Sequence, residues 1–320
     1  MGPPFLIGDS CLIIKGETLN FIETLKRGLN EIRSRNPDFK SVLREITGGE
    51  RFHHIPKEVL DLKKGTYLFL PGSPQRAKDI AENCFDEFEE VEANGRAFSL
   101  YQGTINDKPV ASMTSHMGFG SLEIAALELI SSEIVNTIIR VGTCGALAEF
   151  SSAGERIQAG DLLVGEYASF APLVALSLLK IPWYTAHPNP ELLEAMVRAG
   201  ERTQQDYKYD IGVHCGGIYS KGNLYRDEFL IGTGISNAYH ILVKAIKSRE
   251  HLGTEMEAAL LGMIAEECTQ KGVPVRAGTI CQFVGEIRDG QEAGFANEKV
   301  GRIEKNKQAM YSMIRNVVSE

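Results

Sequence analysis

The chain has 320 residues and a mass of 35.2 kDa, and 43% of its residues are hydrophobic. Such a chain can bury a large core, which excludes a disordered polymer and allows one large α/β domain or two smaller ones. The formal net charge is -8 and the sequence pI is about 5.5, so no global charge attracts nucleic acid or acidic membranes. Any bound anion must be held by a local cluster of cations.

Six cysteines are scattered along the sequence, without the paired spacing of a metal site or the density of a disulfide scaffold. This usage is typical of a reducing compartment. No apolar run approaches the roughly 20 residues that span a bilayer. The start Met1-Gly2-Pro3 lacks the charged and then apolar order of a secretory signal. We expect a cytoplasmic protein that binds neither nucleic acid nor a membrane.

Residues 1–50 are predicted to form an N-terminal extension, and residues 51–320 the main domain. In the extension, residues 17–35 place apolar side chains at helical spacing with basic residues between them, which predicts a helix packed on the outside. The adjacent His53 and His54 point to opposite sides of the chain and have no third ligand nearby, so we expect no metal site there.

The first strand is predicted over residues 66–70, and a helix follows over residues 77–85. Between them, Gly72 makes a turn and Pro74 lies in the first helical turn. The free N–H groups of such a helix start favour an anion. Arg76 opposes the helix dipole at this point unless an anion is bound there.

A hairpin is predicted from residues 95–101 and 110–114, across the turn at 106–108. The next turn, residues 115–120, contains two glycines and precedes a helix predicted over residues 122–134. Its Gly-x-Gly spacing lacks the third glycine of a dinucleotide-binding fingerprint, which argues against a nicotinamide site.

A buried strand with an arginine near its end is the centre of the predicted chemistry. Residues 135–141 are almost continuously apolar, as in a strand covered on both faces, and the turn Gly-Thr-Cys-Gly follows Arg140 and Val141. A guanidinium cannot stay unpaired inside a protein, so Arg140 either points out at the strand edge or meets an anion, with a nearby carboxylate as the alternative partner. The Thr143 hydroxyl and the free N–H groups offer donors to an oxyanion, which suggests a phosphate site.

Strands and helices alternate from the central turn to the C-terminus. The predicted elements are a polar loop over 147–158, strands over 160–164, 212–218 and 277–284, and helices over 188–203, 237–249, 253–271 and from about 297. Glu255 and Glu257 fall at the start of one helix, where the dipole favours acids. Because no internal repeat or linker interrupts this order, we predict a single α/β domain with a mixed central β-sheet flanked by helices.

Four motifs in a fixed order resemble the nucleoside phosphorylase family, of the purine nucleoside and uridine phosphorylase type. They are Gly72 with Arg76, then Arg96, then Arg140 with its Gly-Thr-Cys-Gly turn, and then Glu255-Met256-Glu257. The resemblance runs from about His54 to the C-terminus and leaves residues 1–50 outside it. It implies a fold like that of the nucleoside phosphorylases.

The resemblance also implies roles for single residues. Phosphate is expected to bind Gly72, Arg76, Arg140 and Thr143, with Arg96 supplied by the partner subunit. The ribose is expected to contact Met256, Glu257, the adjacent Glu255 and His54 of the partner subunit, the last at the 5′-hydroxyl.

The reaction that the resemblance implies is phosphorolysis, in which phosphate attacks C1′ of the ribose while the base leaves. The transition state carries positive charge on the sugar, so positioning matters more than a nucleophile of the enzyme. Arg140, Thr143 and Glu257 are the expected catalytic residues. Charge-assisted hydrogen bonds of about 1.5–3 kcal/mol each would let the arginines hold a dianion. Phosphate is a co-substrate, and no metal or organic cofactor is expected.

The base is less clearly specified. Uridine phosphorylases usually carry Gly-Gln-x-Arg after the equivalent of Leu224-Tyr225, but here Arg226-Asp227 follows; purine enzymes place an aspartate after the late strand, where this chain has Glu286. An arginine in this late loop resembles the uridine branch, so the sequence favours a uridine phosphorylase in pyrimidine salvage. A purine nucleoside phosphorylase and a non-catalytic nucleoside-binding relative are the alternatives. The candidate base-binding residues are Cys144, Gly145, Leu224, Tyr225, Arg226, Gln282, Glu286 and Arg288.

A shared active site implies an oligomer, because the resemblance assigns Arg96 and His54 to the partner subunit. We expect a homodimer. Residues 1–50 and the loop over 147–158 add bulk that shorter hexameric relatives do not have, and this bulk would block further assembly. A hexamer is the alternative.

Overall fold

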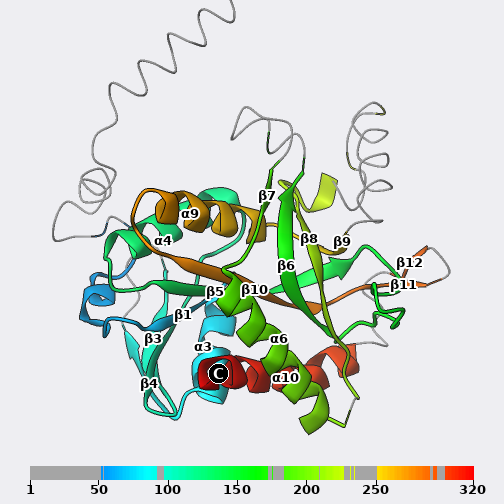
Figure 1. Cartoon of the computed structure of the whole chain (residues 1–320), viewed down its shortest axis with the longest axis horizontal. Helices are drawn as coiled ribbons and strands as arrows, with labels where there is room; N and C mark the ends of the chain where they lie inside the picture. Colours follow the sequence, from blue (N-terminus) through cyan, green and yellow to red (C-terminus); the bar gives the residue numbers. More distant parts are fainter. Residues whose placement is uncertain are drawn as a thin grey trace, which may run out of the picture. The chain divides into compact units, whose positions relative to one another are not determined.

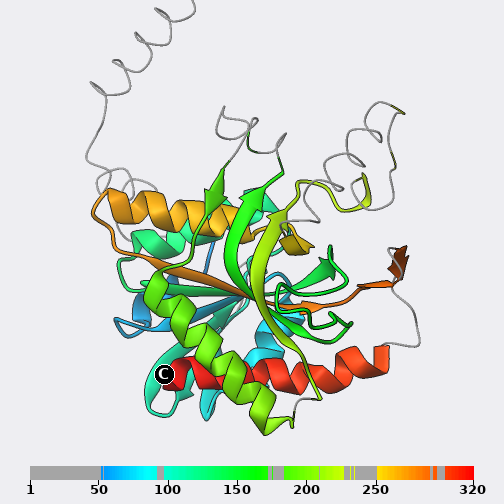
Figure 2. The same cartoon turned by 45° about the vertical axis from the view of Figure 1, so that its right-hand side comes forward.

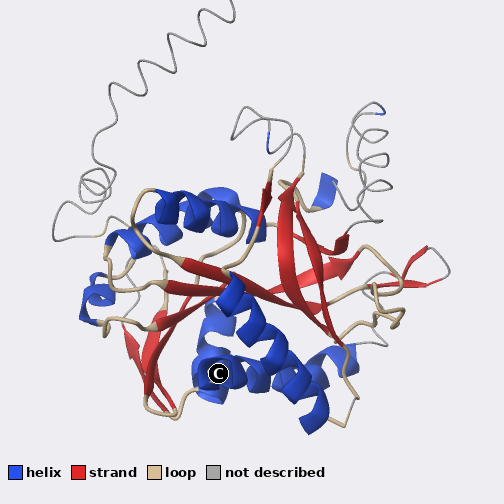
Figure 3. Ribbon diagram, viewed as in Figure 1, coloured by secondary structure: helices blue, strands red, loops and turns tan. Residues whose placement is uncertain are grey.

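The computed structural model describes residues 52, 54–91, 97–171, 175, 184–208, 210–226, 231, 234, 251–288, 291–293 and 300–320. The predicted extension over residues 1–50 and the helix predicted over 237–249 lie outside these ranges. Within them, a mixed sheet has helices on both faces, as Figures 1 and 3 show. This confirms the predicted mixed α/β fold.

One part of the sheet is open and ends in a hairpin edge. Strand β1 pairs in parallel with β4 and with β5, and β3 and β2 continue the β4 side in antiparallel order. The strands from this edge inward are β2 (Glu87–Val91), β3 (Leu100–Ile105), β4 (Lys108–Met113), β1 (Tyr67–Pro71) and β5 (Thr137–Ala146). The predicted hairpin is confirmed as β3 and β4, and β2 was not predicted.

The other part of the sheet closes on itself. Strand β5 pairs in parallel with β10 and, at its last two residues, in antiparallel order with β9; β6 and β8 complete the ring between β10 and β9. Figure 2 shows β6 and β8 as two long curved strands side by side. The ranges are β6 (Leu162–Phe170), β8 (Val213–Ser220), β9 (His251–Glu255), β10 (Arg276–Phe283), the short β7 (Thr185–Ala186) beside β6, and the hairpin β11 (Glu286–Arg288) with β12 (Gln291–Ala293).

Two predicted boundaries near the centre are wrong. The central strand was expected to stop at Val141, but β5 continues to Ala146 because β10 pairs with it as far as Cys144 and β9 takes up the last two residues. A helix was expected from Gly253, but residues 253–255 are strand, since both β8 and β5 pair with β9. In both cases a neighbouring strand decides the conformation.

Helices pack on the two faces of the sheet. Helices α4 (Phe119–Ser131) and α9 (Ala258–Gln270) lie on one face, and α3 (Pro74–Cys84), α6 (Pro190–Asp206) and α10 (Val300–Ser319) lie on the other (Figure 1). A 3₁₀ helix, η1 (Lys57–Asp61), precedes β1. In the described ranges, no helix is long and apolar enough to cross a membrane.

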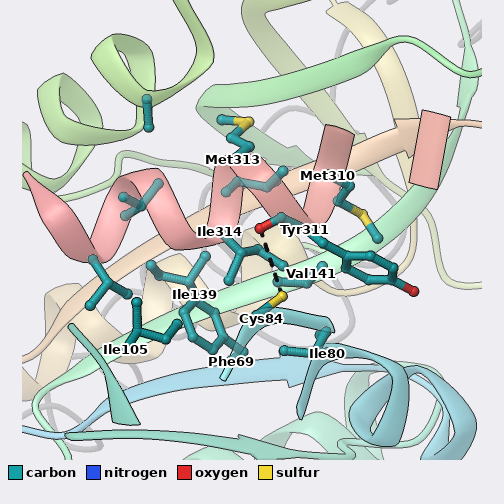
Figure 4. Close-up of a cluster of buried hydrophobic side chains, with 14 of the residues drawn as sticks. Phe69, Ile80, Cys84, Ile105, Ile139, Val141, Met310, Tyr311, Met313 and Ile314 are labelled. Carbon is teal, nitrogen blue, oxygen red and sulfur yellow. Dashed lines mark hydrogen bonds between the residues drawn. The ribbon is translucent and has the colours of Figure 1, made fainter. Parts of the chain in front are cut away.

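Helix α10 covers the core beneath β1 and β5. Figure 4 shows Ile314 of α10 facing Ile139 and Val141 of β5, with Phe69 and Cys84 beside them, whereas Met313 points from the opposite side of the helix. These side chains are almost completely excluded from solvent. The C-terminal helix therefore supports the strand that carries Arg140.

We expect Ile314→Ala to lower the free energy of unfolding by about 2–5 kcal/mol, because it removes buried methyl groups and leaves a cavity under β5. Urea denaturation would measure the change. Lys305→Ala on the exposed side of α10 is the control and should change stability little. Equal stability of the two variants would contradict the proposed support of β5 by α10.

Candidate active site

The carboxyl ends of four parallel strands meet at one edge of the sheet. Strands β4, β1, β5 and β10 run in the same direction, and a loop leaves each of them there. The loops after β1 and β4 are joined, because Ser115 N–H donates to Pro71 O at 2.8 Å. A Cβ on Gly72 would lie only 3.3 Å from His116 O, so glycine permits this approach. In open α/β sheets, ligands bind at such an edge.

Arg140 lies in β5, and its side chain folds along the strand toward this edge. The residue is only 4% exposed and is flanked in register by Leu70 and Thr279. A Cβ at Gly142 would lie 2.9 Å from Arg140 Nη2 and 3.1 Å from its Cζ. Only glycine at this position leaves room for the guanidinium over the backbone.

Two carboxylates hold the guanidinium of Arg140. Its Nε donates to Glu255 Oε2 at 2.8 Å, and its Nη2 forms an ion pair with Glu257 Oε2. Its Nη1 is buried and has no hydrogen-bond partner among the described residues. A carboxylate partner for Arg140, the alternative considered from the sequence, is therefore present, and the Nη1 nitrogen remains to donate to an anion.

Arg76 adds a second positive charge at this edge. It lies in the first turn of α3, whose N-cap Ser73 accepts the Arg76 N–H at 3.1 Å. Within the part of the chain that the structure describes, no hydrogen bond or ion pair engages its guanidinium. Burial, followed by repulsion from Arg140, lowers the pKa of Arg76 from its ordinary value. An anion near both arginines would relieve this repulsion.

Glu255 and Glu257 have different surroundings at the start of α9. The Glu255 carboxylate accepts the N–H groups of Glu257 at 2.8 Å and of Ala258 at 3.0 Å, so it caps the helix. Glu257 is the N-cap residue, and its carboxylate accepts Gly118 N–H at 2.5 Å. Gly118, the N-cap residue of α4, thus positions a carboxylate.

The charges of this cluster influence one another. Burial opposes the charged form of Arg140, but the carboxylates of Glu257 and Glu255 outweigh it and raise the pKa of Arg140. Burial raises the pKa of Glu257, the charge of Arg140 opposes this rise, and Glu255 adds to it. The cluster therefore holds Arg140 as a permanent cation beside two closely spaced acids.

Gln282, a predicted base contact, lies beside Arg76. It pairs in register with Thr143, which is half-buried at the same edge. The Gln282 amide donates to Ile303 O at 2.9 Å and lines a cavity of about 150 Å³ together with Arg76 and Tyr311. Gln282 therefore lies next to the predicted phosphate loop and is bonded to α10.

Glu286 and Arg288, the late-loop residues considered for the base, bind each other. Arg288 Nε donates to Glu286 Oε1 at 2.5 Å, and Glu286 also accepts Ala159 N–H at 3.0 Å. The Arg288 side chain is exposed, whereas Glu286 is buried. Because a carboxylate already accepts from Arg288 Nε, this nitrogen is engaged and does not face a base.

The other predicted residues have varied surroundings. His54 Nδ1 lies 2.6 Å from Glu128 Oε1 of α4, and Arg96 lies outside the described residues. Cys144 is buried in β5, and Gly145 pairs with Thr254 of β9. The others are half-buried Met256 and the exposed Leu224, Tyr225 and Arg226.

Three residues of the cluster were not predicted as site residues. They are Gly118, which holds Glu257, Ser220, whose hydroxyl donates to Glu255, and Lys221, which is buried and whose N–H donates to Glu255 O. Ser220 and Lys221 come at the carboxyl end of a predicted strand. That position is the sequence feature that could have revealed them.

We expect Gly142→Ala to raise the KM for phosphate at least tenfold, because the new methyl group forces the Arg140 guanidinium away from its carboxylates. Steady-state kinetics with varied phosphate would measure it. Gly301→Ala in α10 is the control, since no atom lies within 4 Å of its added Cβ. An unchanged KM for phosphate in Gly142→Ala would contradict the assignment of Arg140 to an anion site.

Comparison with curated proteins reveals relatives of this chain. It is 30% identical over 239 residues to the DeoD-type purine nucleoside phosphorylase of Pectobacterium atrosepticum, covering 75% of this chain and 87% of the relative. It is 33% identical over 201 residues to the protein of the same name from Psychromonas ingrahamii, covering 62% of this chain and 75% of the relative.

Comparison with solved structures gives the same fold. The crystal structure of purine nucleoside phosphorylase from Toxoplasma gondii in complex with immucillin-H matches with a TM-score of 0.60 and 17% identity, covering 81% of this chain and 91% of that one. The family model described as the phosphorylase superfamily matches residues 66–319. The chain therefore belongs to the phosphorylase superfamily and is a nucleoside phosphorylase, an enzyme that transfers a pentosyl group.

Proposed function

We propose that this enzyme is a purine nucleoside phosphorylase, which transfers ribose from a purine base to inorganic phosphate. The observation that supports phosphate as the co-substrate is the buried Arg140. Its Nη1 has no hydrogen-bond partner among the described residues, and its charge lowers the pKa of Arg76. The curated relatives named above support the purine part, since both are purine nucleoside phosphorylases.

In this proposal, phosphate binds between the glycine loop after β1 and the end of β5. Arg140 Nη1, the Arg76 guanidinium and the N–H groups of the α3 start donate to its oxygens. Thr143 adds a hydroxyl from the end of β5. The phosphate oxygen then attacks C1′ of the ribose, the C1′–N bond breaks, and the base leaves with the bonding electrons.

Glu257 binds the ribose hydroxyls in the same proposal. Its carboxylate is already joined to Arg140 and to Gly118, so a sugar held by it lies next to the phosphate. A negative charge at this point also stabilises the positive charge that develops on the ribose. Glu255 does not share this role, because its oxygens accept from Arg140 and from the first turn of α9.

The purine assignment replaces the uridine phosphorylase that the sequence favoured. That interpretation relied on an arginine in the late loop as a donor to uracil, but Arg288 pairs with Glu286. The glutamate in turn holds Ala159 of the preceding loop. Arg288 Nε and the Glu286 carboxylate are therefore bonded to protein groups in place of a pyrimidine. The names of the relatives favour purines.

We expect phosphate-dependent release of hypoxanthine from inosine at a rate at least tenfold above the release of uracil from uridine. An assay of free base with each nucleoside, with and without phosphate, would measure both rates. Faster uridine cleavage would restore the uridine assignment. Cleavage without phosphate would indicate a nucleosidase, and no cleavage of either nucleoside would indicate a non-catalytic relative.

We also propose that the functional unit is a homodimer with shared active sites. The family resemblance assigns Arg96 to the site of the other subunit, where it would complete the set of phosphate donors. We expect homodimers of Arg96→Ala and of Arg140→Ala to be nearly inactive, and a mixture of the two to regain activity. In a mixed dimer, one site has both arginines from unaltered positions. Subunit exchange without recovered activity would exclude a contribution of Arg96 across the interface.

A further inference from the structure

Ser220 is a buried hydroxyl at the end of β8, two residues beyond the strand predicted over 212–218. It lies opposite Glu255 in the parallel register of β8 and β9 and is fully excluded from solvent. Its Oγ donates to Glu255 Oε1 at 2.5 Å and accepts Ala259 N–H at 3.0 Å. The hydroxyl therefore uses its one proton on Glu255 and is fixed in direction by α9.

The Glu255 carboxylate has a donor on every side. Oε1 accepts from Ser220 and from Ala258 N–H, and Oε2 accepts from Arg140 Nε, Glu257 N–H and Ala258 N–H, at 2.5–3.0 Å. The four backbone and hydroxyl contacts fix the plane of the carboxylate, and the guanidinium takes its orientation from that plane. Ser220 contributes the one side-chain hydroxyl among these donors.

The orientation of the guanidinium decides where its last donor points. A guanidinium is planar, so fixing Nε against Glu255 and Nη2 against Glu257 leaves the direction of Nη1 no freedom. If Glu255 turns, the whole plane turns with it. A rotation that moves Nη1 by about 1 Å is enough to weaken binding and transfer to phosphate.

We propose that Ser220 is a positioning residue of the phosphate site: through Glu255 it holds Arg140 so that Nη1 faces the attacking phosphate. This inference rests on the proposed function, because it takes phosphate as the ligand of Arg140. Ser220 itself touches neither phosphate nor nucleoside. Loss of the Ser220 hydroxyl therefore weakens phosphate binding more than nucleoside binding, because Glu257 holds the ribose.

The test compares Ser220→Ala with Ser169→Ala in the full chain. Ser169 is the matched control, because it is a buried hydroxyl on the neighbouring strand β6 that bonds Thr185 Oγ1 at 2.8 Å and, among the described residues, forms no side-chain hydrogen bond with the Arg140 cluster. We expect Ser220→Ala to raise the KM for phosphate about tenfold and to leave the KM for inosine within twofold. Ser169→Ala should leave both constants near their unaltered values.

Two further variants separate positioning from folding. Ser220→Thr keeps the hydroxyl and should restore most of the phosphate affinity, while Ser220→Cys keeps the size with a weaker donor and should give an intermediate KM. The phosphate-induced rise in melting temperature, recorded without nucleoside, should follow the same order. If Ser220→Ala does not fold, the Thr and Cys variants carry the comparison.

The outcomes distinguish this inference from the proposed function. If Ser220→Ala keeps the phosphate KM and the phosphate-induced stabilisation of the unaltered enzyme, Ser220 is only structural and the inference is wrong. An equal rise in both Michaelis constants would also overturn it, as would a Cys variant indistinguishable from the unaltered enzyme. If the unaltered enzyme shows neither phosphorolysis nor stabilisation by phosphate, the proposed function fails, and the inference fails with it.

Discussion

A single buried guanidinium sets the requirements of the rest of this structure. Arg140 is almost wholly excluded from water, so every one of its donors needs an acceptor. Glu255 and Glu257 accept from two of its nitrogens, and both acids are supported by groups from other elements: the first turn of α9, the end of β8 and the turn before α4. Gly142 leaves the space in which the guanidinium lies. Removing any of these supports would leave a buried charge without its full set of partners.

The arrangement separates two demands that phosphorolysis makes on a cation. A site for a phosphate dianion needs a charge that stays in place before the ligand binds, and it also needs a donor that is not consumed by the groups that keep it there. In the proposed phosphate site, the carboxylates at Nε and Nη2 meet the first demand, and Nη1 meets the second. Among the described residues Arg76 has no such carboxylate partner, and its pKa is lowered by burial and by Arg140. Arg140 is thus held in place by carboxylates before an anion binds, whereas Arg76 is not.

Local patterns in the sequence predicted most of the order of strands and helices, and the family resemblance predicted that Gly72, Arg76, Arg140 and Glu257 belong to one site. They failed where another strand decides the outcome. The extension of β5 through its glycines depends on β10 and β9, and β9 replaces an expected helix start for the same reason. Side-chain partners were harder still: the pairing of Arg288 with Glu286 and the hydroxyl of Ser220 on Glu255 join residues whose relation appears only once the chain is folded.

Because β5 pairs with three strands, substitutions in it and substitutions in the exposed loops have different effects on the enzyme. The β5 backbone from Arg140 to Ala146 is held by β1, β10 and β9, so a substitution that shifts it disturbs several ladders at once. The candidate base contacts Leu224, Tyr225 and Arg226 are exposed beyond the end of β8, and Arg288 is exposed in a two-stranded hairpin outside the main sheet. Changes there leave the ring of strands intact. Substrate choice can thus change through substitutions at these exposed residues while the strands that hold Arg140 stay as they are.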